Sequence, residues 1–316
     1  MLISDPAGNS QTGNRPGGGV TIDRMYAPPV LNRTVLVTGC STGIGQATAL
    51  RLRAGGWTVF PTARAEADLE RLRTEGFDPV RLDMADETSV SEAVAETLRR
   101  AGTTGLGGVV NNAGFGQPGA VEDVSRAAFR HQFEVNLFGM QDLTNRLLPT
   151  LRRQGWGRIV NISSVVGRIS LPFMGAYSAT KFAMEALSDA MRVELHASGI
   201  AVSLVEPGPI ATAFGDNVAR SGRQTLKPES SVFGEVYRKK LDPVTTRGDP
   251  KERFRLPPDA VARAIAHALE SPHPHRRYTV TVPAKLGAWC ARFLPDAVLD
   301  RLLIAYVRER TNDSAH

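Results

Sequence analysis

The chain has 316 residues, of which 42% are hydrophobic and 22% charged, and its formal net charge is +6. This composition places it in the soluble globular class, with enough apolar residues to bury a full core. The positive charge comes without aromatic-interleaved basic clusters or zinc ligands, which excludes a nucleic-acid reader. The two cysteines are far apart and the histidines lack metal-ligand spacing, so we expect no disulfide framework, no metal and a reducing, cytoplasmic compartment.

Residues 1–30 are rich in Gly, Pro, Asn and Ser and lack the apolar core of a secretory signal, so we predict a disordered N-terminal extension. One folded unit is expected over residues 31–285. Within it, short apolar runs alternate with helical stretches, and we predict strands near 34–38, 57–62, 79–82, 108–112, 157–163, 200–206 and 277–283. This order indicates an α/β fold, a Rossmann-type doubly wound parallel sheet of about seven strands in a single domain.

The first predicted strand runs directly into a glycine-rich turn, TGCSTGIG, which is followed by a helical sequence. Glycines at positions 39, 43 and 45 allow a tight turn and close approach of the backbone to a ligand. The helix N-terminus behind them offers unpaired amide groups to an anion, so this layout favours a pyrophosphate. An ordinary glycine-rich turn between strand and helix is the alternative reading.

A second motif combines a hydroxyl, a phenol and an ammonium group. Thirteen residues separate Ser164 from Tyr177, and Lys181 follows the tyrosine by four residues. Residues four apart share a helix face, so the ammonium lies close enough to stabilise phenolate and to lower the tyrosine pKa, together with a cationic cofactor. This set predicts a proton-transfer site. The neighbouring Ser163 competes for the serine role, and the spacing selects Ser164.

Together these motifs, with NNAG at 111–114, Asn136 in FEVNLFG and the PGPIAT segment, resemble the classical short-chain dehydrogenase/reductase (SDR) family over about residues 31–285. The glycine turn, the TAR sequence after the second predicted strand and the C-terminal extension resemble members similar to 17β-hydroxysteroid and retinol dehydrogenases. The resemblance implies an NAD(P)-binding catalytic domain, hydride transfer, and a tetrad at Asn136, Ser164, Tyr177 and Lys181. In the family the asparagine anchors a water on the proton path; a helix-interior asparagine that satisfies backbone groups is the alternative.

The resemblance also implies the cofactor contacts. These are expected at Gly39, Ser41, Gly43, Ile44, Gly45, Arg64, Asp83, Met84, Asn112, Ala113, Gly114, Tyr177, Lys181, Pro207, Gly208 and Thr212. NAD-preferring folds place an acidic residue at the end of the second strand, where this chain has Ala63 followed by Arg64. Arginine can bind a 2′-phosphate, and Ser41 adds a hydroxyl, so NADP(H) is favoured over NAD(H). A surface arginine opening the next helix is the alternative for Arg64.

We therefore predict an NADP(H)-dependent oxidoreductase that interconverts a secondary alcohol and a ketone on a bulky apolar, steroid-, retinoid- or lipid-like molecule. Side chains that could line its pocket, or be ordinary packing, are Phe173, Met174, Phe214, Val218, Val232, Phe233 and Tyr237. Two alternatives stay open. One is a β-ketoacyl reductase, whose basic segment 216–257 would meet an acidic carrier protein, and the other is a non-catalytic NADP-sensing protein.

The C-terminal sequence 286–316 has apolar residues at helical spacing on both sides of Pro295 and predicts two short amphipathic helices. Neither is long enough to span a bilayer. Packing against the chain's own domain is the favoured placement, and a cover over the substrate pocket, a subunit interface and peripheral membrane contact are the alternatives. The resemblance also implies a homo-oligomer.

Overall fold

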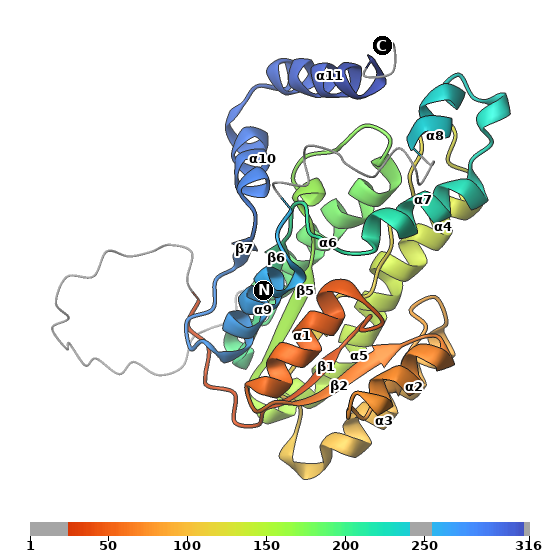
Figure 1. Ribbon diagram of the computed structural model, residues 1–316. Helices are drawn as coiled ribbons and strands as arrows, with labels where there is room; N and C mark the ends of the chain where they lie inside the picture. Colours follow the sequence, from red (N-terminus) through yellow and green to blue (C-terminus); the bar gives the residue numbers. More distant parts are fainter. Residues whose placement is uncertain (1–24, 241–254, 313–316) are drawn as a thin grey trace, which may run out of the picture.

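A computed structural model describes residues 25–240 and 255–312 of the chain. The predicted fold class is confirmed: seven parallel strands form one sheet in the order β3-β2-β1-β4-β5-β6-β7 among these residues (Figure 1). The strands are β1 (Thr34–Val37), β2 (Thr58–Ala63), β3 (Val80–Arg81), β4 (Gly108–Asn111), β5 (Gly157–Ile162), β6 (Ile200–Glu206) and β7 (Arg277–Thr279).

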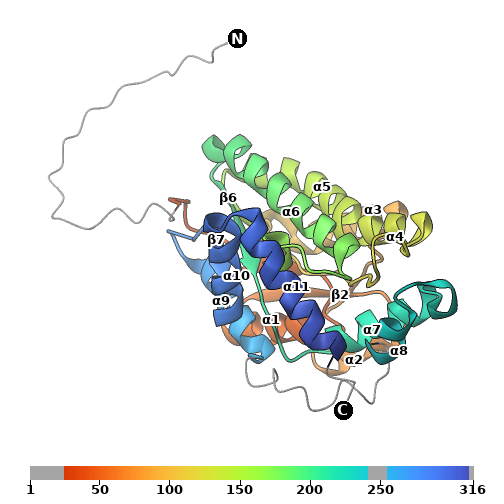
Figure 2. The same cartoon turned by 90° about the horizontal axis from the view of Figure 1, so that it is seen from above.

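Helices cover both faces of the sheet, as the view from above shows (Figure 2). One layer comprises α3 (Glu87–Ala101), α4 (Arg126–Phe133), α5 (Gly139–Gln154) and α6 (Gly175–Glu194). The other comprises α1 (Gly43–Ala54), α2 (Glu66–Thr74) and α9 (Pro258–Glu270). The arrangement is a three-layer α/β domain.

The side-chain alternation of the strands divides the core between these two layers. Leu36 in β1 joins the cluster under α3, α5 and α6, while its neighbours Val35 and Val37 join the cluster under α1 and α9. All three are fully buried. A parallel sheet covered on both faces needs such continuous apolar strands, and the short apolar runs of the sequence reflect this requirement.

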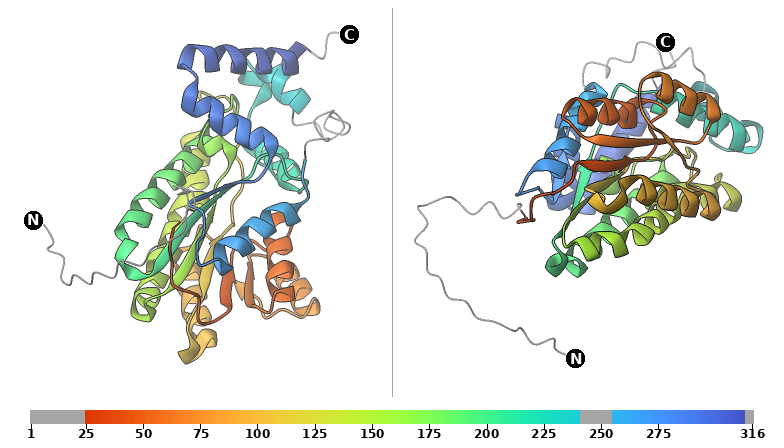
Figure 3. Two further views of the ribbon diagram at one scale, coloured as in Figure 1. Left: turned by 90° about the vertical axis from the view of Figure 1, so that its left-hand side faces the viewer. Right: turned by 90° about the horizontal axis from the view of Figure 1, so that it is seen from below.

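Smaller helices and the C-terminal helices gather above the carboxyl ends of the strands. They are α7 (Phe214–Thr225), α8 (Gly234–Lys240), α10 (Val282–Phe293) and α11 (Asp296–Asn312). Figure 3 shows α11 lying across this end of the molecule, next to α8. The carboxyl edge of a parallel sheet is where ligands bind in this fold class, so these helices surround the expected site.

The structure differs from the sequence at two expected boundaries, the end of the N-terminal extension and the start of the C-terminal helices. Residues 1–24 lie outside the described residues, but the Met25 and Ala27 N–H groups donate to the carbonyls of Pro274 and Pro272 at 3.0 and 3.1 Å, and Ala27 is buried. Residues 25–30 therefore belong to the packed body and not to an extension. The C-terminal helices do break at Pro295, but the first begins at Val282, before the expected boundary at 286.

Candidate active site

Helix α6 brings the expected phenol and ammonium groups together. Tyr177 and Lys181 lie one turn apart and are 8% and 5% exposed. The Lys181 ammonium donates a 2.7 Å hydrogen bond to the carbonyl of Ile162, the last residue of β5. The same nitrogen lies 5.7 Å from the centre of the Tyr177 ring. The helix thus holds a buried cation beside the phenol at the carboxyl edge of the sheet.

Ser164 follows β5 and meets Tyr177 from the other side. Its hydroxyl accepts from the Val166 N–H at 3.3 Å and lies 3.5 Å from the Pro207 carbonyl, to which it donates. The Val165 N–H donates to the same carbonyl at 3.0 Å. The Ser164 hydroxyl also acts on the pKa of Tyr177, which it lowers as a hydrogen-bonding group. The structure therefore assembles the serine, tyrosine and lysine in one place.

Burial shapes the pKa values of this set. It lowers the pKa of Lys181 from 10.5 to about 8, and the nearby Glu185 carboxylate opposes the change. Burial also raises the pKa of Tyr177, and the Ser164 hydrogen bond offsets only part of this rise. We expected the lysine and a cationic cofactor together to lower the tyrosine pKa. In the chain alone burial outweighs the groups that lower this pKa, and the positive charge of a bound cofactor would act in the lowering direction.

Asn136 is fully buried in the π-helical segment η2 (Glu134–Phe138), between α4 and α5. Its side-chain oxygen accepts from the Phe115 N–H at 3.0 Å, and its amide nitrogen donates to the Phe115 carbonyl at 2.9 Å. Single π turns inside helices are frequent at functional sites. Both of these contacts satisfy backbone groups, so the asparagine fixes the segment after β4 against η2.

The glycine turn forms a cradle that side chains would fill. Gly39 has a φ of 72°, and a Cβ there would lie 2.8 Å from the Ala113 Cα. A Cβ on Gly45 would lie 2.1 Å from the Gly39 carbonyl oxygen. The backbone is therefore free to approach a ligand where α1 begins, and the N–H groups of that helix face an anion. These residues fit the pyrophosphate of a dinucleotide.

The neighbouring segments complete the walls of the cradle. Asn112 donates its amide to the carbonyls of Thr38 and Gly39 at 2.9 and 3.1 Å. The Thr38 hydroxyl accepts from the N–H groups of Asn112 and Ala113, both at 2.9 Å. Thr38 was missed from the sequence, although its position at the end of β1 was the signal. The structure places Gly114, whose Cβ would meet the Asn136 oxygen at 3.1 Å, on the same wall.

The segment after β6 closes the opposite side. A Cβ on Gly43 would lie 3.1 Å from Thr212 Cγ2, so the PGPIAT segment faces the glycine turn. Gly208 is packed beneath the C-terminal helices, because its Cβ would meet the Thr281 hydroxyl at 2.1 Å and Ala284 Cβ at 3.2 Å. The structure thus brings Thr212 beside the glycine turn, Pro207 beside Ser164 and Gly208 beneath the start of α10, while Ile44 packs against the core cluster under α1.

Arg64, Asp83 and Met84 lie at the ends of β2 and β3. The Arg64 side chain is 68% exposed, and its guanidinium lies 3.9 Å from the Asp83 carboxylate. Met84 is buried. Its carbonyl oxygen lies so close to Gly139, the first residue of α5, that a Cβ there would be 1.9 Å from it. A residue missed from the sequence, Arg71 on α2, donates to the carbonyl of Ser41 at 2.6 Å and so supports the glycine turn. Nothing in the sequence pattern marked it.

Apolar side chains gather beside the tyrosine. The Phe214 ring lies 5.5 Å from the Tyr177 ring, and a Cβ on Gly116 would lie 2.9 to 3.2 Å from Val218, Phe214 and Met174. These three residues form an apolar wall next to the phenol.

The other pocket residues expected from the sequence lie elsewhere. Phe173 packs edge-on against Phe233 and Tyr237, at 5.3 and 6.3 Å between ring centres. Tyr237 also shares a hydrogen bond with Asp123. Val232 is 86% exposed. The first three therefore anchor α8, and Val232 contacts solvent.

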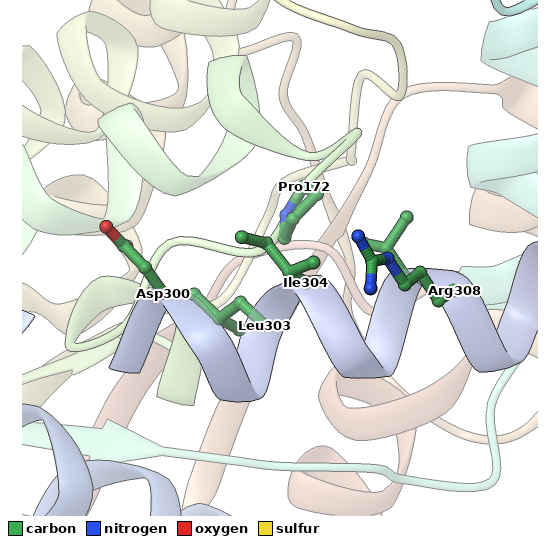
Figure 4. A pocket seen from close by; sticks show the side chains of 6 residues that line it. Pro172, Asp300, Leu303, Ile304 and Arg308 are labelled. Carbon is green, nitrogen blue, oxygen red and sulfur yellow. The ribbon is translucent and has the colours of Figure 1, made fainter. Parts of the chain in front are cut away.

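A further apolar hollow lies at the rim of the site. A pocket of about 450 Å³ is lined by Pro172, Leu303, Ile304 and Val307, with Asp300 and Arg308 at its edges. Figure 4 shows α11 presenting these side chains to Pro172. Pro172 precedes Tyr177 by five residues, so this pocket lies between α11 and the loop that leads to α6.

Comparison of the sequence with known protein families identifies the family of this chain. The model of the short chain dehydrogenase family matches residues 33–222. The chain belongs to the short-chain dehydrogenase family. It is therefore an oxidoreductase of an NAD(P)-binding family, and the resemblance predicted from its motifs is confirmed.

Several relatives of this short-chain dehydrogenase match over most of their length. The uncharacterized oxidoreductase YbbO of Escherichia coli (strain K12) is 43% identical over 87% of this chain and 95% of its own. The NADPH-dependent 3-dehydrocapnine reductase of Ornithobacterium rhinotracheale is 36% identical over 89% and 100%. Retinol dehydrogenase 16 of Mus musculus is 34% identical over 89% and 90%. The crystal structure of a short-chain dehydrogenase from Streptomyces avermitilis, 29% identical, covers 90% of this chain and 98% of its own with a TM-score of 0.67.

The lowered pKa of Lys181 predicts a measurable cost to stability. The folded-state pKa is about 8 against an ordinary 10.5, so the unfolded chain binds this proton more tightly. The cost of the buried charge to the free energy of unfolding is complete below about pH 8 and disappears as the pH rises from about 8 to 10.5. We expect Lys181→Met to be more stable than the wild type at pH 7 by roughly 1–3 kcal/mol, after loss of the Ile162 hydrogen bond. The advantage shrinks by pH 10.5.

Urea denaturation at several pH values measures this difference. Lys285→Met, on the exposed side of α10, is the matched control and should show no such dependence. A Lys181→Met protein less stable than the wild type at pH 7, or a difference that does not vary with pH, would contradict the prediction.

Proposed function

We propose that this short-chain dehydrogenase is an NADP(H)-dependent enzyme that interconverts a secondary alcohol and a ketone on a bulky apolar substrate. The observation that carries the proposal is the assembly of Ser164, Tyr177 and Lys181 beside the apolar wall of Phe214. A hydroxyl donor, a phenol and a buried ammonium are the groups that hydride transfer to a carbonyl needs around the oxygen atom.

Each side chain has a distinct task in this reaction. The Ser164 hydroxyl holds the substrate oxygen near the phenol, and Tyr177 gives its proton to that oxygen in reduction or removes it in oxidation. Lys181, fixed by the Ile162 carbonyl, stabilises the phenolate that remains. The bound nicotinamide supplies or accepts the hydride. The glycine turn, Asn112, Ala113 and Thr212 would hold the dinucleotide.

The apolar wall supports a bulky apolar substrate. Met174, Phe214 and Val218 face the space around Gly116, and Phe214 touches the Tyr177 ring. These side chains favour a hydrocarbon framework next to the reacting carbon. The similarity to proteins described as a retinol dehydrogenase and a 3-dehydrocapnine reductase supports the same substrate class.

Charge at the end of β2 supports NADP(H). The Arg64 guanidinium is largely exposed and has a weak partner, Asp83, at 3.9 Å, so it can turn to a phosphate. Ala63 stands at the position where NAD-preferring folds place a carboxylate, so that particular source of repulsion toward a 2′-phosphate is missing. Arg71 adds a positive charge that is hydrogen-bonded to the carbonyl of Ser41 in the glycine turn. The similarity to an NADPH-dependent 3-dehydrocapnine reductase agrees with this preference.

We also propose that α10 contacts the surface of an anionic membrane. Four apolar side chains of this helix, Val282, Leu286, Trp289 and Phe293, are 53–74% exposed, so only its other face packs against the domain. The helix also carries Lys285 and Arg292 and has no acidic residue. Among the residues that the structure describes, no helix is long and apolar enough to cross a bilayer. An apolar stripe beside basic residues is typical of helices that lie in the membrane interface.

Replacing the phenol separates an enzyme from a cofactor sensor. We expect Tyr177→Phe to lower kcat by about a thousandfold or more, because the proton donor is lost, while NADPH binding persists. Oxidation of NADPH is followed by absorbance over a panel of steroids, retinoids, quinones, other ketones and ketoacyl thioesters, and NADPH binding by fluorescence. Undiminished turnover would refute the mechanism, and activity confined to carrier-bound thioesters would assign the chain to β-ketoacyl reductases.

Cofactor preference tests Arg64. We expect Arg64→Gln to raise the KM for NADPH about tenfold, because a charge-assisted contact to the 2′-phosphate is lost, and to leave the KM for NADH nearly unchanged. Arg73→Gln, which removes an exposed arginine from α2, is the control and should alter neither value. A wild-type enzyme that prefers NADH would overturn the assignment.

Vesicle flotation tests the apolar stripe. We expect the full chain to float with vesicles of phosphatidylglycerol and phosphatidylcholine, and the double change Trp289→Ser and Phe293→Ser to reduce the bound fraction about tenfold. Val232→Ser, on an equally exposed valine away from α10, should bind as the wild type does. If the wild type stays unbound and elutes as a dimer that the double change dissociates, the stripe is a subunit interface instead.

A further inference from the structure

The face of α6 that carries the tyrosine and lysine continues beyond the site. At the same four-residue spacing, Tyr177 and Lys181 are followed by Glu185 and Asp189. Glu185 is 6% exposed and lies close enough to Lys181 to raise its pKa. Buried carboxylates are uncommon unless they are paired, so this row calls for positive partners.

Those partners come from the edge of the sheet. The Arg277 guanidinium in β7 lies 3.1 Å from Glu185, 2.6 Å from Asp189 and 3.2 Å from Glu206, measured to carboxylate oxygens. Arg168 adds a second positive charge 3.9 Å from Glu185 and 3.7 Å from Glu206. A single arginine fork therefore joins α6 to the ends of β6 and β7.

This ion cluster touches both halves of the proposed catalytic set. Glu206 is the last residue of β6 and precedes Pro207, whose carbonyl holds the backbone of Val165 and the hydroxyl of Ser164. On the other side, Glu185 follows Lys181 by one helical turn. The Thr279 hydroxyl donates to the second oxygen of Glu206 at 2.9 Å and leaves that carboxylate little freedom.

The segment that follows Ser164 packs closely against the helix that carries Tyr177 and Lys181. A Cβ on Gly167, in η3 (Val165–Gly167), would lie 2.8 Å from the Ser163 hydroxyl, 3.1 Å from the Lys181 carbonyl oxygen and 3.2 Å from Glu185 Cγ. A shift of α6 would therefore move the serine segment as well.

We propose that Arg277, Glu185 and Glu206 form a positioning unit that holds the Tyr177 and Lys181 helix in register with the Ser164 segment and keeps a carboxylate one helical turn from Lys181. The inference rests on the proposed function of those three side chains. The Arg277 guanidinium donates to Glu185 and to Asp189 on the same helix, with Glu206 beside it, and such a two-point contact has one geometry, whereas apolar packing would tolerate small slides of the helix. Displacements on the order of 1 Å are enough to reduce turnover by about a hundredfold.

The electrostatic part of the unit has a definite sign. The titratable and charged groups that face Glu185 are Lys181 and Asp189 on α6, Glu206 on β6, Arg277 on β7 and Arg168 after η3. Burial and the Glu206 charge raise the pKa of Glu185, and Arg277 opposes them. Removing the Glu185 charge therefore lowers the pKa of Lys181 further below its present value of about 8.

A direct titration tests this part without requiring turnover. The chain has six lysines, so lysine labelled with carbon-13 gives few NMR signals, and Lys181→Met assigns the relevant one. We expect the Lys181 signal to titrate about one pH unit lower in Glu185→Gln than in the wild type. Arg192→Gln, which removes an arginine from the same helix without touching Glu185, should leave it in place.

Kinetics test the positioning part. We expect Arg277→Gln to lower kcat about tenfold or more with the KM for NADPH within twofold of the wild type, and Arg277→Lys to recover part of the loss. If Arg277→Gln does not fold, Arg277→Lys alone must show an intermediate loss. An unshifted Lys181 titration in Glu185→Gln, or wild-type kcat in the arginine variants, would overturn the inference. Absence of NADPH turnover in the wild type would instead refute the proposed function, and the titration would still decide the electrostatic claim.

Discussion

A buried ammonium group is the constraint on which this structure depends. Lys181 is removed from water and keeps a single strong acceptor, the carbonyl at the end of β5. Burial weakens its hold on the proton, so the folded chain carries an amine whose charge is easily changed by its neighbours. Residues on four elements are arranged around it: the tyrosine on its own helix, the serine after β5, the carboxylate of β6 and the arginine of β7.

The cofactor cradle depends on a different principle, which is the absence of side chains. Gly39 and Gly45 allow backbone segments from three elements to approach within distances that no Cβ could tolerate. The threonine at the end of β1 and the asparagine after β4 then satisfy the polar groups left at these junctions. These glycines are therefore needed for close packing of backbone segments as much as for binding of a ligand.

Much of this arrangement could be predicted from the sequence because its signals are local. Strand positions followed from runs such as Val35–Val37, and the pairing of Tyr177 with Lys181 followed from helical periodicity. The division of the aromatic residues did not: whether Phe173 or Phe214 lies beside the tyrosine depends on how the segments after β5 and β6 pack, which no local pattern encodes. The support that Arg71 gives the glycine turn is likewise a contact between residues thirty positions apart.

The pKa of Tyr177 could not be predicted from the sequence for a different reason. Spacing correctly placed a cation next to the phenol, but the cost of burying Tyr177 could only be judged from the packed structure. The partners of Glu185 were equally inaccessible, because Arg277 follows it by ninety-two residues and meets it only through the order of the strands.

The seating of Gly208 against Thr281 and Ala284 has a consequence for how the chain is divided. The start of α10 closes over the segment that forms one wall of the cofactor cleft, and any side chain on Gly208 would collide with it. The first turn of α10 is therefore no detachable appendage. A truncation of the chain before residue 282 would remove the residues that cover Gly208. The catalytic domain therefore extends through the first turn of α10.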